Sequence, residues 1–240
     1  MLITSMLLPS PDPGRLVSFY SEVLGLPTAG FVVTAGHSTI RVVDGPTAPG
    51  SHHLAFSIPL AKVPAARTWL ASRAELLVRD GRDLFTFDPP FGPAESLYVA
   101  DPDESVLELI GRDGPPPAAG SGFDPTIDIT GLAEVAIPLA AVPEAVELLT
   151  TLWSLPAVLA SPEFAAVGDR AGMFILVRPG RPWFPTADRL PNLTPLAVDV
   201  DTGHSVRPRT LTFANQTTAT ASRTERGDQG KTTPLDGPRD

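Results

Sequence analysis

Two ionisable residues stand in strand-like runs where their side chains could do chemistry. His53 lies in a run that predicts a strand, and because alternate residues of a strand face opposite sides, it shares a small, polar face with Ala55 and Ser57. Glu108 lies in the apolar run 106–110, where a buried carboxylate needs a partner. We expect both side chains to face a cavity, as metal ligands or as an acid–base pair in which Glu108 raises the pKa of His53. The alternatives are a structural histidine and a glutamate that reaches solvent at the end of its strand.

Tyr98 stands ten residues before Glu108, across a turn at Asp101-Pro102-Asp103. Its hydroxyl either enters the pocket or packs in the core. The turn continues with Glu104 where a residue that adopts positive φ cheaply would be expected, so we predict a longer or strained turn.

Several short elements must position these residues. A helix is predicted to begin at Pro13, with Asp12 as its N-cap, and to end at Gly25. A second helix is predicted to begin at Val63-Pro64. The predicted strands of this first segment are 2–8, 30–35, 39–43, 52–58, 84–87, 96–100 and 106–110.

An internal repeat indicates that the chain is modular. The segment Ile58–Ala66 recurs as Ile137–Ala145, with seven of nine positions identical. Each copy is predicted to run from a strand end into a helix that has proline in its first turn. We therefore expect one β-α-β unit to be used at least three times.

Composition divides the chain into four parts. Residues 1–112 form one predicted domain and 123–213 a partial second copy of it, joined by the Pro- and Gly-rich linker 113–122. The tail 214–240 has few large apolar residues and is predicted to be disordered.

Overall composition excludes several classes of function. The 240 residues include no cysteine, so any metal site must use His, Asp, Glu or solvent. The net charge of −9 argues against binding to nucleic acid or to an anionic membrane. There is no apolar run long enough for a transmembrane helix and no signal peptide, so we expect a cytoplasmic protein. Phosphate-binding glycine loops and a serine-hydrolase elbow are also absent from the sequence.

Three motifs in order resemble the vicinal oxygen chelate superfamily. That group includes glyoxalase I, extradiol dioxygenases, fosfomycin-resistance thiol transferases and bleomycin-binding proteins. The motifs are Phe19-Tyr20-x-x-Val23-Leu24-Gly25-Leu26, then His53-Leu54-Ala55-Phe56, then Tyr98-x-x-Asp101-Pro102-Asp103-x-x-x-x-Glu108-Leu109-Ile110.

The resemblance implies an α+β fold in which paired βαβββ modules form an open, cup-shaped sheet around a divalent metal. It implies one ligand from the first strand of each module and a glutamate from a last strand. Carried onto this chain, those positions are His53 and Glu108, whereas the histidine of the first module falls on Ser5. A serine hydroxyl is a poor ligand for a first-row metal, so the predicted set for Fe, Mn, Ni or Zn is incomplete.

The second segment carries two further features. Glu134 aligns with Ser5 by its distance to the following helix and could point into a second cup, but residues 123–203 contain no histidine. The sequence therefore predicts no family-type metal site there. The segment Arg181-Pro182-Trp183-Phe184-Pro185 either covers a pocket mouth or seals a domain interface.

Two functions remain open from the sequence. One is a glyoxalase- or dioxygenase-like enzyme that acts on a small molecule in the N-terminal cup, with His53 and Glu108 as catalytic residues and metal ligands. The other is a metal-free binding protein that sequesters its ligand. In both, Ser5, Ser57 and Tyr98 are candidate ligand-binding residues, and the protein is a monomer or homodimer.

Overall fold

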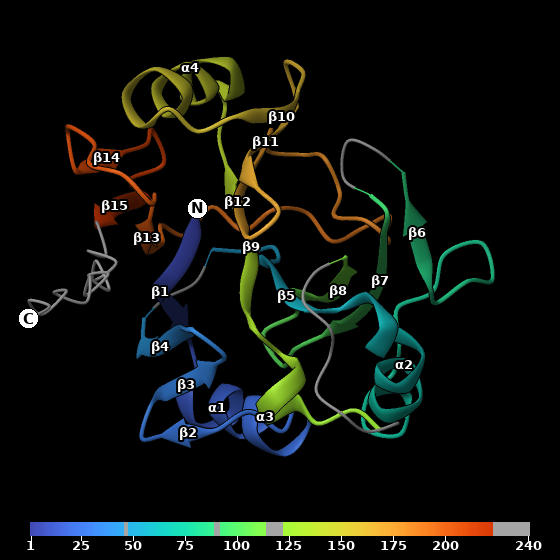
Figure 1. Ribbon diagram of the computed structural model, residues 1–240. Coiled ribbons are helices and arrows are strands. Elements are labelled where there is room, and N and C mark those ends of the chain that lie inside the picture. The colour runs from blue at the N-terminus through green and yellow to red at the C-terminus, as the bar shows by residue number, and fades with distance from the viewer. Residues whose placement is uncertain (46–47, 89–91, 114–121, 223–240) are drawn as a thin grey trace, which may run out of the picture.

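The computed structural model describes residues 1–45, 48–88, 92–113 and 122–222. It confirms the predicted α+β class: the strands form one strongly curved mixed sheet that does not close into a barrel, and helices lie around its outside (Figure 1). Among the described residues, no helix is long and apolar enough to cross a membrane.

The first module follows the predicted strand–helix–strand order. The side chain of Asp12 accepts a hydrogen bond from the backbone N–H of Arg15 at 3.0 Å, which caps the predicted helix. Leu16 and Tyr20 point from that helix into the core. The elements are β1 (Leu2–Ser10), α1 (Pro13–Glu22), β2 (Thr28–Ala29), β3 (Val32–Ala35) and β4 (Ser38–Asp44), with β4 parallel to β1.

The second module carries His53 on its first strand and Glu108 on its last. Its turn before the last strand places Glu104 at φ +63°, which confirms that a residue other than glycine adopts the left-handed conformation there. The elements are β5 (His53–Pro59), η1 (Leu60–Lys62), α2 (Val63–Ala71), β6 (Phe85–Phe87), β7 (Ala94–Ala100) and β8 (Val106–Arg112), with β8 parallel to β5.

The third module confirms the repeat. Pro138 ends a strand and Val142 begins a helix, as Pro59 and Val63 do in the second module. Trp153 closes that helix and is fully buried. The elements are α3 (Pro125–Asp128), β9 (Gly131–Pro138), α4 (Val142–Trp153), β10 (Ala157–Ala160), β11 (Phe164–Asp169) and β12 (Gly172–Val177), with β12 parallel to β9.

A fourth, partial module corrects the predicted start of the disordered tail. It consists of β13 (Ala197–Asp201), β14 (Thr210–Thr212) and β15 (Thr218–Ser222), and β15 pairs in parallel with β13. Ala219 and Ala221 are buried there. These small residues gain order from backbone pairing with β13 and β14 rather than from bulky side chains, which is why composition missed them. The rest of the predicted tail, 223–240, and the linker positions 114–121 lie outside the described residues.

The modules do not pair as expected. Strand order runs β14-β15-β13-β1-β9-β5-β8-β7-β6. The first strand of the second module, β5, pairs antiparallel with β9 of the third, and β1 of the first module pairs antiparallel with β13 of the fourth. Strands β1 and β9 pair only at Ile3 and Leu132. The expectation that residues 1–112 form one cup with Ser5 and His53 on its two central strands is therefore wrong. The second and third modules form a cup across the predicted linker.

Candidate metal centre

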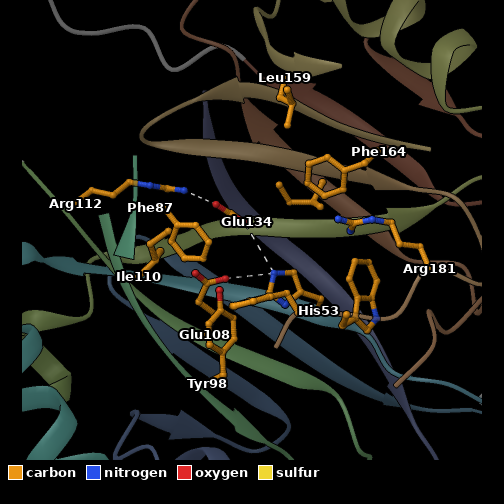
Figure 2. A pocket seen from close by; sticks show the side chains of 13 residues that line it. His53, Phe87, Tyr98, Glu108, Ile110, Arg112, Glu134, Leu159, Phe164 and Arg181 are labelled. Atoms are coloured by element: carbon orange, nitrogen blue, oxygen red, sulfur yellow. Dashed lines mark hydrogen bonds and ion pairs between the residues drawn. The ribbon is translucent and has the colours of Figure 1, made fainter. Parts of the chain in front are cut away.

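A cavity of about 290 Å³ opens between the second and third modules. Its base is polar and its walls are mostly apolar and aromatic (Figure 2). The lining residues are His53, Phe87, Tyr98, Glu108, Ile110, Arg112, Glu134, Leu159, Phe164, Ile175, Arg181, Trp183 and Phe184.

Three neighbouring strands bring one histidine and two glutamates together at the base of the cavity. Ala55 on β5 pairs with Glu108 on β8 and with Glu134 on β9, and His53 lies two residues before Ala55 on the same strand face. The Nε2 atom of His53 lies 3.4 Å from Oε2 of Glu108 and 3.9 Å from Oε2 of Glu134 (Figure 2). The small side chain of Ala55 leaves room for the two carboxylates on either side of it.

The imidazole of His53 is fixed on its other edge and on its face. Its Nδ1 lies 3.2 Å from the carbonyl oxygen of Val106 and donates to it, which leaves Nε2 for the carboxylates. The indole of Trp183 stacks on the ring at a centroid distance of 5.3 Å. Burial by itself lowers the pKa of His53, but Glu108 and Glu134 outweigh burial and raise that pKa to about 9.

Glu108 is held by a buried hydroxyl. Ser96 on β7 is fully buried, and its Oγ donates to Oε1 of Glu108 at 2.5 Å. Tyr98 stands directly opposite Glu108 in the β7–β8 ladder. Burial and the nearby carboxylates of Glu108 and Glu134 raise the pKa of the Tyr98 hydroxyl well above its usual value, so Tyr98 stays protonated and can donate a hydrogen bond.

Glu134 is paired with a second buried cation. The guanidinium of Arg112, at the end of β8, donates from Nη2 to Oε1 of Glu134, and both side chains are more than nine-tenths buried. Nη1 of Arg112 also donates to the carbonyl oxygen of Arg170 at 3.3 Å. Burial tends to raise the pKa of Glu134, but hydrogen bonding to His53 and the charge of Arg112 lower it, so this carboxylate stays ionised.

Comparison with known proteins bears on the fold. No protein family model matches the chain, and no curated protein matches it. Among solved structures, a candidate dioxygenase from Bacillus subtilis is similar with a TM-score of 0.58 and 14% identity, over 92% of this chain and 84% of that one. A variant of glyoxalase I from Zea mays is similar with a TM-score of 0.57 and 10% identity, over 92% of both chains. This chain has the vicinal oxygen chelate fold.

The donor set of this vicinal oxygen chelate cup fits a divalent metal. His53, Glu108 and Glu134 can each offer one ligand atom, and these atoms lie within 4.8 Å of one another. Two ligands on a metal with bonds of about 2.1 Å lie roughly 3.0–3.4 Å apart at octahedral to tetrahedral angles. The two separations that involve His53, 3.4 and 3.9 Å, are at or near the upper end of this range. One imidazole with two carboxylates suits Fe²⁺, Mn²⁺ or Zn²⁺ better than Ca²⁺, because Ca²⁺ prefers sites made of oxygen ligands alone.

The sequence predictions have mixed outcomes at this site. His53, Glu108 and Tyr98 line the cavity together. Ser57 is not among the lining residues. It follows the register shift between Ala55 and Phe56 on β5, and its carbonyl oxygen accepts a hydrogen bond from the backbone N–H of Thr130. Ser5 also lies outside it, because Ser5 belongs to the pair formed by the first and fourth modules, where its hydroxyl donates to Asp199 at 2.6 Å.

Sequence reasoning missed part of the site and misjudged another part. Ser96 and Arg112 carry no motif that marks them as partners of the two carboxylates. The sequence indicates that Glu134 could point into a second cup, but the absence of histidine in residues 123–203 predicts no family-type metal site there. The internal repeat contains the signal that could have found Glu134. It aligns Glu134 with Ala55, and these two residues pair between β9 and β5. The cationic–aromatic segment lines the pocket through Arg181, Trp183 and Phe184.

Proposed function

We propose that this protein is a metal-dependent enzyme of the glyoxalase or dioxygenase type that acts on a small organic molecule with two neighbouring oxygen atoms. The observation that carries the proposal is the set formed by His53, Glu108 and Glu134 at the base of an aromatic-walled cavity. The sequence resemblance supplies only His53 and Glu108 as ligands. In this proposal Glu134 is the third ligand, a carboxylate in place of the expected histidine.

The chain's own residues would prepare the site. A divalent metal held by the three residues would supply a Lewis acid that binds and polarises the substrate oxygens. The Val106 carbonyl and the Ser96 hydroxyl hold His53 and Glu108 in orientation, in the way that outer partners hold ligands in metal sites. The Tyr98 hydroxyl stays protonated and can donate to a substrate oxygen.

Metal content and thermal melts with Mn²⁺, Fe²⁺, Ni²⁺ and Zn²⁺ test this proposal. We expect about one metal per chain and a rise in melting temperature on saturation, since a ligand of the native state at 100 times its Kd stabilises by about 2.7 kcal/mol. His53→Ala and Glu134→Gln should abolish both effects. Glu144→Gln, on the outer helix α4, serves as the matched control and should behave like the unchanged protein. If the unchanged protein shows neither metal nor a shift, the proposal fails.

A second candidate is a metal-free binding protein. The observation that favours it is the mutual neutralisation of the cluster: His53 lies between Glu108 and Glu134, and Arg112 pairs with Glu134. Such a cluster can persist in the core without an ion. In this case metal would leave the melting temperature unchanged, whereas a bound small molecule would raise it, and Glu134→Gln would reduce stability rather than metal affinity.

A further inference from the structure

Arg181 is a cation at the cavity that has no carboxylate partner among the described residues. It is exposed, it lines the cavity, and its guanidinium carbon lies 4.5 Å from the centre of the Phe164 ring. Figure 2 shows this guanidinium above His53, on the side of the cavity away from Glu108. Neighbouring arginines differ from it: Arg178 pairs with Glu163, and Arg189 pairs with Glu104.

The two carboxylates inside the cavity cannot satisfy Arg181. Glu134 is already paired with Arg112, and Glu108 is paired with His53 and hydrogen-bonded by Ser96. Among the described residues, the exposed guanidinium of Arg181 therefore stands at the cavity without a carboxylate partner. A stacked guanidinium keeps its in-plane N–H groups free, and these groups match the geometry of a carboxylate.

Aromatic side chains also line the cavity. Phe85, Phe184 and Tyr98 pack edge to face, with Phe184 5.7 Å from Tyr98 between ring centres. Phe87 lies beside Phe184 on the same wall, 5.9 Å away. Edge-to-face clusters of this kind bind planar rings well, because a further ring can add to the same offset arrangement. The volume of about 290 Å³ is near the lower limit of ligand pockets and suits one substituted ring.

We propose that the ligand of this cavity is an aryl anion: a single aromatic ring that lies between the phenylalanine walls and bears a carboxylate that Arg181 binds. The protein as a whole is acidic, with a net charge of −9, so an anionic ligand gains nothing from long-range attraction. A preference of the cavity for an anionic ligand must therefore come from the local charge of Arg181. The proposal rests on the proposed function only in placing the ligand in this cavity, and it requires no metal for its test.

Benzoate and benzamide form a matched pair of probes, since they have the same shape and differ in charge. Binding to the metal-free full chain is followed by fluorescence of Trp183, which lines the cavity. The Trp183→Phe variant should lose the signal, which assigns it to the cavity. We expect benzoate to bind about tenfold more tightly than benzamide, because one charge-assisted hydrogen-bonded pair contributes a difference of about that size. Added salt should weaken benzoate binding alone.

Arg181→Gln should reduce the ratio of the two affinities to within about twofold. Arg178→Gln removes the same charge from a neighbouring exposed arginine outside the cavity lining, so it should retain the full preference. Equal binding of the two probes, no binding of benzoate, or a preference that survives Arg181→Gln would each overturn the inference. Because metal is absent, none of these outcomes bears on metal binding, which the metal titrations test separately.

Discussion

Replacing Arg112 with methionine tests the electrostatic logic of the site. Arg112 and Glu134 are buried together, with 4% and 8% of their side chains exposed. Removing one partner of a buried pair costs about 3–5 kcal/mol, because the other charge is left without compensation. His53 lies 3.9 Å from Glu134 and compensates in part, so we expect a loss near the lower end, about 3 kcal/mol. For a chain of this size that lowers the melting temperature by roughly 6–12 °C.

Two further measurements make this prediction specific. In Arg112→Met/Glu134→Gln both members of the pair are neutral, so thermal melts should show most of the loss recovered. A divalent metal that bound Glu134 would replace the missing charge, so the metal-induced rise in melting temperature should be larger in Arg112→Met than in the unchanged protein. An Arg112→Met protein as stable as the parent, or a double variant less stable than the single one, would refute the reasoning.

The remaining predictions concern separate features. The pKa of His53 is raised to about 9, so the contribution of His53 to metal-free stability should be complete below pH about 6.5 and be lost as pH rises through 9, as the difference between melts of the parent and of His53→Ala across pH will show. Ser96→Ala removes the donor to Glu108 and should weaken metal affinity about 10-fold by titration. Ala219→Asp buries an unpaired charge in β15 and should lower the denaturation midpoint, whereas a disordered segment would tolerate it. Ser5→His should leave the metal affinity of the cup unchanged, because Ser5 lies in the other module pair; a gain lost again in Glu108→Gln would contradict this pairing.

Local patterns predicted the elements well, because the forces that form them act over a few residues. The cap at Asp12, the repeated strand-to-helix transition and the cavity-facing side of His53 needed only spacing and residue type. The pairing of β5 with β9 could not be predicted in this way, because it depends on which first strands meet across a linker. Because β5 pairs with β9, Glu134 lies in the site and Ser5 lies outside it. The partners Ser96 and Arg112 followed from the same registers.

The two module pairs both join through antiparallel first strands, but the side chains on those strands differ. In the first–fourth pair, the central strands place Ser5 opposite Asp199, and both residues are partly or well exposed. In the second–third pair, His53 and Glu134 are buried and meet Glu108 from a third strand. Among the described residues, no other group of histidines and carboxylates could hold a metal. Because β9 contacts β1 through Ile3 as well as β5 along its length, the first–fourth pair flanks the strand that carries Glu134. The first–fourth pair therefore borders the strand that carries Glu134, and among the described residues it holds no comparable group of its own.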